Sequence, residues 1–185
     1  DIVCLQEVRA FNRQQARRFK HWPEQGQADF LAPEGYTPVY CTNAITKHGE
    51  HGNALLSRWP VLQHRHEDMS DHRLEQRGLL HVTLNIQERE LHVIVIHLGL
   101  LPGSRIRQTQ QLHDFIEREV PADAPLLVAG DFNDWGNAVA KMMATVGLHT
   151  DEGRPHPTYP SRLPLVQLDH VYARGVHRVA THVPR

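Results

Sequence analysis

Residues 126–135 read "LLVAGDFNDW", an apolar run that ends in a cluster of oxygen-bearing side chains. A short run such as Leu126 to Ala129, apolar on both faces, is typical of a strand buried inside a sheet. Gly130 stops the run, and Asp131 and Asn133 follow at once. The stretch therefore predicts a buried strand that carries polar groups to one edge of a sheet, where a crevice can form.

The composition limits the classes of function. A chain of 185 residues is long enough for one domain with a sizeable core. Its net charge of -1 gives no overall positive field, so a nucleic-acid role needs a local site. Most of the 15 histidines are scattered without a repeated ligand spacing, which indicates surface or core positions more than a metal cluster.

The two cysteines, Cys4 and Cys41, cannot build a disulfide framework or a four-cysteine zinc site, so a reducing, cytoplasmic location is expected. No run of 18 apolar residues is present, so we expect no transmembrane segment. Nothing in the pattern indicates an obligate protein partner.

Periodicity along the chain predicts alternating strands and helices. Strands are expected at 2–8, 36–41, 52–60, 126–130 and 165–173, with a hairpin over 79–98. Helices are expected at 9–22, at 104–119 with Ser104 as the N-cap, and at 138–145, while most of 23–50 is expected to be loop. A hairpin among strand–helix alternations favours a mixed α/β sandwich over a purely parallel sheet.

Five residues with metal- or phosphate-binding side chains fall in or at the ends of these strands: Glu7, His97, Asp131, Asn133 and Asp169. Each alone is more often a solvated cap or a hydrogen-bonded core residue. Together they match the needs of phosphodiester hydrolysis, in which a carboxylate holds a divalent cation, an Asp orients water and Asn and His donors face the developing charge.

A calcium loop is the alternative for residues 131–142. Asp131, Asn133 and Gly136 occupy the first, third and sixth positions of such a loop. The twelfth position, which should be a bidentate Glu, is Met142, and the fifth is Trp135. The missing carboxylate disfavours calcium binding.

Six stretches in this order, "CLQEV", "HGNALLSRWP", "RGLLHV", "VIVIHLGL", "GDFNDW" and "LDHVY", resemble the endonuclease/exonuclease/phosphatase superfamily of metal-dependent phosphodiesterases, which includes deoxyribonucleases and sphingomyelinases. The resemblance runs from residue 1 to about residue 174. It implies a deoxyribonuclease-like α/β (α+β) fold, a four-layer sandwich of two mixed sheets flanked by helices, with the site at one end of the sheets. It also implies hydrolysis of a nucleic-acid or phospholipid-type phosphodiester.

By resemblance, each candidate has a role. Glu7 is the Mg²⁺ ligand, with Mn²⁺ as the other candidate ion; His97 binds phosphate or acts as an acid; Asp131 orients water or acts as the general base; and Asn133 donates to the scissile phosphate. Asp169 matches an aspartate that orients the catalytic histidine, so His170 beside it is not that histidine. Asn53 and Arg77 match positions near the phosphate, although Arg77, in "EQRG", fits a solvated charge equally well.

Two departures from the family pattern concern the ends. Family members begin with a strand that carries a metal-site Asn and end with a Ser-Asp-His motif, and neither is found in residues 1–185. We therefore expect residues 1–185 to be a single domain trimmed at both ends. A non-catalytic binding module or pseudo-enzyme on the same scaffold is the rival interpretation, and reading the gene on both sides discriminates the two.

Overall fold

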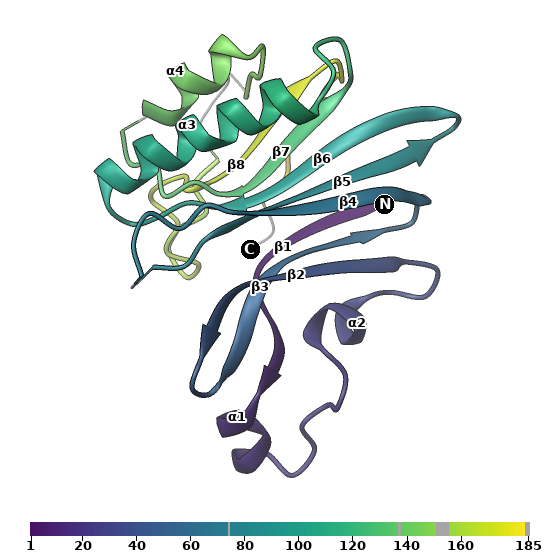
Figure 1. Cartoon of the computed structure of the whole chain (residues 1–185), viewed down its shortest axis with the longest axis vertical. Helices are drawn as coiled ribbons and strands as arrows, with labels where there is room; N and C mark the ends of the chain where they lie inside the picture. The colour runs from purple at the N-terminus through teal and green to yellow at the C-terminus, as the bar shows by residue number, and fades with distance from the viewer. Residues whose placement is uncertain (74, 137, 151–155, 184–185) are drawn as a thin grey trace.

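The protein is described by a computed structural model that covers residues 1–73, 75–136, 138–150 and 156–183. Within these residues, eight strands form two sheets (Figure 1). The smaller sheet is antiparallel, in the order β1 (Ile2–Asn12), β3 (Gly49–Ser57) and β2 (Thr37–Thr46). The larger is mixed, in the order β4 (Val61–Asp68), β5 (Gly78–Ile86), β6 (Arg89–His97), β7 (Leu126–Asp131) and β8 (Asp169–Arg174), with β6 and β7 parallel.

Helices cover the outer faces of both sheets. α3 (Pro102–Glu119) and α4 (Ala138–Thr145) lie on the larger sheet, and α2 (Gln27–Leu31) lies against the smaller one (Figure 1). A fourth helix, α1 (Arg13–Arg18), follows directly after β1. None of the described helices is both long and apolar enough to cross a lipid bilayer.

Three separate apolar cores hold the layers together. One lies between the larger sheet and α3 and α4, and includes Ile94, Val128 and Phe115. A second fills the space between the sheets, with Leu55 from one and Val95 from the other. The third lies under α2. Alternate residues of β6 and β7 enter the first and second cores, so both faces of these strands are buried. The expected four-layer sandwich is confirmed.

Several local assignments were wrong. The helix expected over 9–22 is only α1, because β1 continues to Asn12, where Phe11 and Asn12 pair with Glu50 and Gly49 of β3. The segment 23–50 contains α2, all of β2 and the start of β3. Ser104 is not an N-cap: α3 begins at Pro102, and the Ser104 hydroxyl donates to Asp71.

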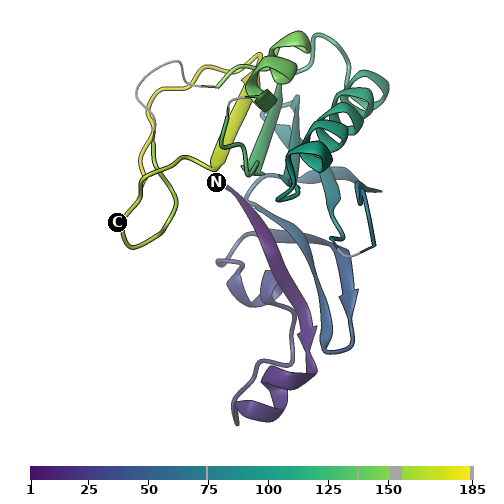
Figure 2. The same cartoon turned by 90° about the vertical axis from the view of Figure 1, so that its left-hand side faces the viewer.

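The end of β1, α1 with the residues that follow it, and the β2–β3 turn project beyond the body of the sandwich (Figures 1 and 2). We call this projection, residues 9–22 and 45–50, the arm. The Arg13 amide donates to the His48 carbonyl at 2.7 Å, which ties α1 to the β2–β3 turn. The arm therefore consists of two chain segments that this backbone hydrogen bond connects.

Candidate active site

Three candidate residues lie side by side across three neighbouring strands. His97 ends β6, Asp131 ends β7 and Asp169 begins β8. The strand register pairs His97 with Asp131 and Asp131 with Asp169. Because partners on adjacent strands lie about 5 Å apart, this row brings one imidazole and two carboxylates to the same edge of the larger sheet.

Glu7 reaches this row from the smaller sheet. The β1–β3 register shifts between Leu5 and Val8, and Glu7 within this irregularity has φ +54°. A bulge turns a side chain away from the regular alternation of its strand. The Glu7 carboxylate lies 3.9 Å from His97 Nδ1, while His97 Nε2 lies 3.7 Å from Asp131 Oδ2. The imidazole of His97 therefore sits between the two carboxylates.

Asn133 fixes the turn after β7. Its backbone has φ +48°, and its amide N–H donates to Asp131 Oδ1 at 2.9 Å. Its side-chain Nδ2 donates to the Leu98 carbonyl at 2.9 Å, which joins the loop after β7 to the loop after β6. One hydrogen of that amide group is used in this way, so a single hydrogen remains for another acceptor.

Burial and neighbouring charges shift the pKa of both central groups. Desolvation raises the pKa of Asp131, and Asp169 and Glu7 raise it further, against the lowering effects of the Asn133 N–H and of Arg77. Desolvation, followed by the charge of Arg77, lowers the pKa of His97 to about 4, although Glu7, Glu75 and Asp169 oppose this. At neutral pH His97 is therefore uncharged, with one ring nitrogen able to donate and the other able to accept.

Arg77 is not a solvated charge. Its side chain is 12% exposed, and Nη2 donates to Glu75 Oε1 at 3.2 Å. The same Glu75 oxygen accepts from the Leu100 amide at 3.0 Å, in the loop that follows His97. Glu75 thereby holds the guanidinium beside the row of strand ends. Sequence reasoning missed Glu75, because its loop has no periodic pattern; its place two residues before Arg77 was the available signal.

Asn53 lies beneath the site, between the sheets. It is fully buried, and its Nδ2 donates to the carbonyls of Gly78 at 2.8 Å and Val95 at 3.1 Å. Both amide hydrogens are therefore used in a contact between β3 and the larger sheet. Its role in substrate binding stays a prediction.

Asp134 and His170 have structural contacts. Asp134 accepts hydrogen bonds from the Ala138 and Val139 amides at 3.3 and 2.9 Å, so it caps the start of α4. The ring of His170 packs against Phe132 and Tyr172, with centroid separations of 5.8 and 5.7 Å. Of the polar residues in "GDFNDW", only Asp131 and Asn133 thus belong to the candidate site.

The charge around Glu7 fits a bound cation. Four carboxylates lie close enough for their charges to affect the pKa of His97 or of one another: Glu7, Glu75, Asp131 and Asp169. The positive charge of Arg77 affects the pKa of both His97 and Asp131. A divalent ion would offset this excess of carboxylates, which otherwise raises the pKa of Asp131. Another group of possible ligands, His113, Asp114 and Glu117, lies on α3, about 16 Å along the helix from its start near the site.

Comparison with known proteins identifies the family. The model of the endonuclease/exonuclease/phosphatase family matches residues 1–185. This chain belongs to that family. Proteins of the family are generally hydrolases of the phosphodiesterase or phosphatase type, and they generally depend on a divalent metal ion.

A curated relative is the uncharacterized protein YbhP of Escherichia coli K12, 36% identical over 183 residues, which cover 95% of this chain and 72% of the relative. Among solved structures, a family protein from Leptotrichia buccalis aligns with a TM-score of 0.70 at 16% identity, over 94% of this chain and 75% of that one. The human nocturnin catalytic domain aligns with a TM-score of 0.67 at 21% identity, over 94% and 68%. Both structures support the fold.

Proposed function

We propose that this protein is a magnesium-dependent phosphodiesterase whose site is the edge formed by Glu7, His97, Asp131, Asn133 and Asp169. The observation that supports this most is the strand register His97–Asp131–Asp169, with the Glu7 carboxylate facing the row from the other sheet. Asp131 Oδ1 caps the turn at the Asn133 N–H, but its Oδ2 still faces His97. The phosphodiester reaction needs a cation ligand, a base and a donor in one place.

Each side chain then has a task set by its surroundings. Glu7 is the proposed ligand of Mg²⁺ or Mn²⁺, and Asp169, exposed at the same edge, adds negative charge. When bound, the ion neutralises phosphoryl oxygens and lowers the pKa of water. Asp131, whose pKa is raised by burial and by Asp169 and Glu7, is suited to align a water molecule and take its proton.

The remaining groups bind and orient the phosphate. His97, neutral and placed between Glu7 and Asp131, can donate its one N–H to a phosphoryl oxygen. Its other ring nitrogen keeps a lone pair that can accept a hydrogen bond. The free amide hydrogen of Asn133 and the guanidinium of Arg77 provide further donors to a doubly negative transition state. The proposed substrates are phosphodiesters of nucleic acids or of lipid head groups.

The test uses protein produced from the whole gene and bis(p-nitrophenyl) phosphate as a generic phosphodiester. We expect hydrolysis with Mg²⁺, its loss with EDTA, and a fall in kcat of roughly 100-fold or more in Asp131→Asn, as for other general-base losses. The matched control is Asp123→Asn, which changes an exposed carboxylate before the opposite end of β7.

Two results contradict the proposal. Equal turnover by Asp131→Asn and the wild-type protein would remove Asp131 from the reaction. Absence of metal-dependent hydrolysis of this phosphodiester, with the fold intact by circular dichroism, would favour the non-catalytic binding module instead.

A further inference from the structure

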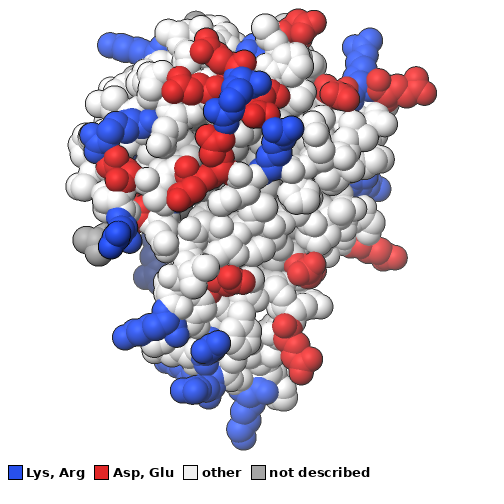
Figure 3. Space-filling view, viewed as in Figure 1, with Lys and Arg blue, Asp and Glu red and all other residues white. Residues whose placement is uncertain are grey.

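The arm carries a local positive charge that the whole chain lacks. Residues 9–22 contain five of the 20 lysines and arginines, and no Asp or Glu, in a chain whose net charge is -1. The five are Arg9, Arg13, Arg17, Arg18 and Lys20. Figure 3 shows Lys and Arg side chains gathered over the lower end of the molecule, where Figure 1 places α1.

Part of this charge surrounds a pocket. The pocket has a volume of about 400 Å³ and lies between α1 and the β2–β3 turn, lined by Arg13, Gln14, Arg17, Lys47 and His48. Within the described part of the chain, no carboxylate forms an ion pair with Arg13, Arg17 or Lys47. Cations without acidic partners that converge on one pocket favour an anionic ligand.

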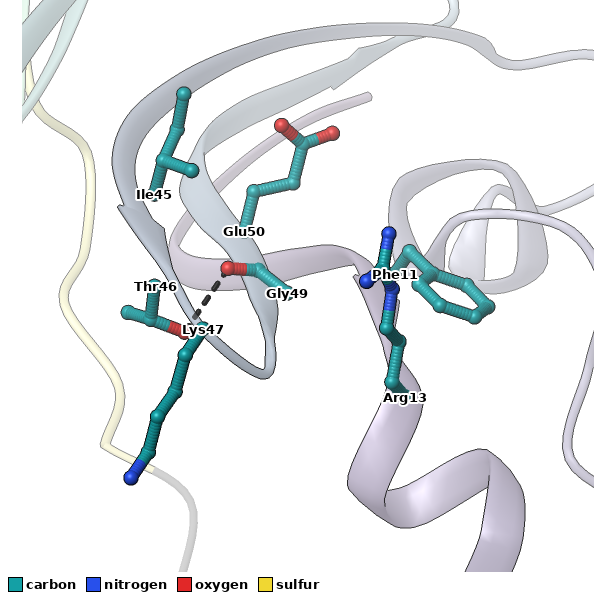
Figure 4. A pocket seen from close by; sticks show the side chains of 7 residues that line it. All are labelled: Phe11, Arg13, Ile45, Thr46, Lys47, Gly49 and Glu50. Atoms are coloured by element: carbon teal, nitrogen blue, oxygen red, sulfur yellow. Dashed lines mark hydrogen bonds between the residues drawn. The ribbon is translucent and has the colours of Figure 1, made fainter.

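Apolar side chains lie exposed beside these cations. A neighbouring pocket of about 380 Å³ is lined by Phe11 and Ile45, by the cations Arg13 and Lys47 and by one carboxylate, Glu50 (Figure 4). Phe11 is 43% exposed, Ile45 73% and Phe19 51%. Phe19 stacks on Trp22 with a centroid separation of 6.4 Å. Large apolar groups that project from a basic surface are typical of segments that enter the boundary between lipid head groups and acyl chains.

We propose that the arm is a docking surface for anionic lipid bilayers. The basic pocket takes the phosphate of a lipid head group, and Phe11, Phe19 and Ile45 enter the bilayer around it. A nucleic acid is the other polyanion that such charge attracts, but single strands stack bases on aromatic rings. Ile45, the most exposed of the three, has no ring on which a base could stack, whereas any large apolar side chain can enter the head-group boundary of a bilayer.

The arm also lies close to the candidate active site along the chain. Glu7 and Arg13 are six residues apart on and just after β1, which spans at most about 20 Å of extended strand. A bilayer held at the arm is thus near the row of strand ends. Where the phosphodiesterase proposal also holds, membrane lipids become available substrates, and this consequence alone depends on that proposal.

The experiment measures cosedimentation of the whole-gene protein with vesicles of phosphatidylcholine and phosphatidylglycerol in a two-to-one ratio, and with phosphatidylcholine alone. The test variant is Arg13→Gln/Arg17→Gln/Lys47→Gln. The matched control, Arg58→Gln/Arg89→Gln/Lys141→Gln, removes the same charge at exposed positions outside the arm. A second variant, Phe19→Ser/Ile45→Ser, keeps the charge and removes two apolar groups.

We expect binding only to the anionic vesicles. The test variant should weaken it on the order of 100-fold, since each cation near an anionic surface contributes a factor of about five. The control should bind as the wild type does. High NaCl weakens charge attraction but not the burial of apolar groups, so Phe19→Ser/Ile45→Ser should lose the binding that persists at high NaCl. Hydrolysis of bis(p-nitrophenyl) phosphate, where present, should be equal in all of them, which separates failure of docking from failure of the catalytic proposal.

Three results would overturn docking at the arm: equal binding to both kinds of vesicle, no loss of binding in the test variant, or a loss of the same size in the control. If the protein ignores vesicles but binds a DNA oligonucleotide in a way that needs Arg13, Arg17 and Lys47, the ligand is a nucleic acid and the bilayer proposal is wrong.

Discussion

Glu7 and Asn133 are two of the four non-glycine residues held at positive φ, +54° and +48°, in the part of the chain that the structure describes. Such conformations are costly for a residue with a side chain, and they persist where surrounding contacts enforce them. At Asn133 the Asp131 carboxylate and the Leu98 carbonyl supply those contacts. At Glu7 the irregular pairing of β1 supplies them, and the result is a carboxylate directed at His97.

For Glu7→Gln, we expect the Mg²⁺ concentration that gives half-maximal hydrolysis to rise by roughly 10-fold or more, because an anionic oxygen ligand becomes a neutral amide. Stability should change little, since the side chain is 64% exposed. A metal titration of the whole-gene protein measures this, with Glu34→Gln, an exposed residue before β2, as the control. An unchanged titration would make Glu7 only a structural residue of the β1 bulge.

The residue scale also shows what the sequence can predict about a site. His97, Asp131 and Asp169 were predictable because each interrupts or ends an apolar run, and neighbouring strand ends meet in a sheet. The contribution of Glu75 had only a weak signal, its place two residues before Arg77, because it depends on a loop between β4 and β5 folding back to the Leu100 amide. The hydrogen bonds of Asn53 across the sheets likewise depend on tertiary packing that no local pattern encodes.

At the scale of elements, Gly130 sets the approach of β7 to β6. It pairs with Ile96, and a Cβ built on Gly130 would lie 1.8 Å from the Ile96 carbonyl oxygen. Only a residue without a side chain allows the two strands to lie so close immediately before His97 and Asp131. The glycine in "LLVAGDFN" is thus required by backbone packing, whereas the sequence alone indicated only that the apolar run stops there.

We predict that Gly130→Ala destabilises the protein by roughly 2–4 kcal/mol, because the parallel pair must separate or shift its register. Gly136→Ala is the matched control, since a Cβ at Gly136 meets nothing within 4 Å. Urea unfolding followed by circular dichroism measures both variants. If Gly130→Ala were as stable as Gly136→Ala, the prediction would be wrong, because β6 and β7 could then separate without loss of stability.

The elements that were predicted correctly share a clear pattern, and those that were missed lack one. The β5–β6 hairpin, β7, α3 and α4 have strong periodicity or continuous apolar runs within their bounds. β4 was missed because its central residues, "QHRHE", are polar: it is an edge strand whose charged groups pair with α3, as in Arg65–Glu119 at 2.6 Å. β1 beyond Val8 looked helical, and pairing with β3 overrides that local tendency.

At the scale of the whole molecule, three apolar cores stabilise four layers, and one of the cores includes a polar pair. His81 and His92, on β5 and β6, are 2% and 3% exposed beneath α3. Their rings stack with a centroid separation of 5.2 Å, and His81 Nε2 lies 2.9 Å from His92 Nδ1. One ring donates to the other, so this contact needs at least one neutral imidazole with a lone pair.

This pair makes the stability of the fold depend on pH. Desolvation, followed by the charges of His92 and Arg65, lowers the pKa of His81 to about 4 from its usual 6.5, and desolvation also lowers the pKa of His92. The unfolded chain therefore takes up protons that the folded chain refuses as pH falls below 6.5. We therefore expect the contribution of this pair to stability to be present above about pH 6.5 and to decrease progressively down to about pH 4, by roughly 2–3 kcal/mol for His81 alone.

We predict that His81→Leu/His92→Leu reduces this loss by a similar amount, because it removes both titrating groups and keeps apolar bulk next to Phe115, whose ring lies 5.5 Å from that of His81. The measurement is the free energy of unfolding in urea at a series of pH values from 7 to 4. His97 and His170, whose pKa values burial also lowers, should leave a residual slope. His21→Gln/His64→Gln, which changes two exposed histidines, should retain the wild-type profile. A double leucine variant with the full wild-type pH dependence would show that the buried pair is not what couples this fold to pH.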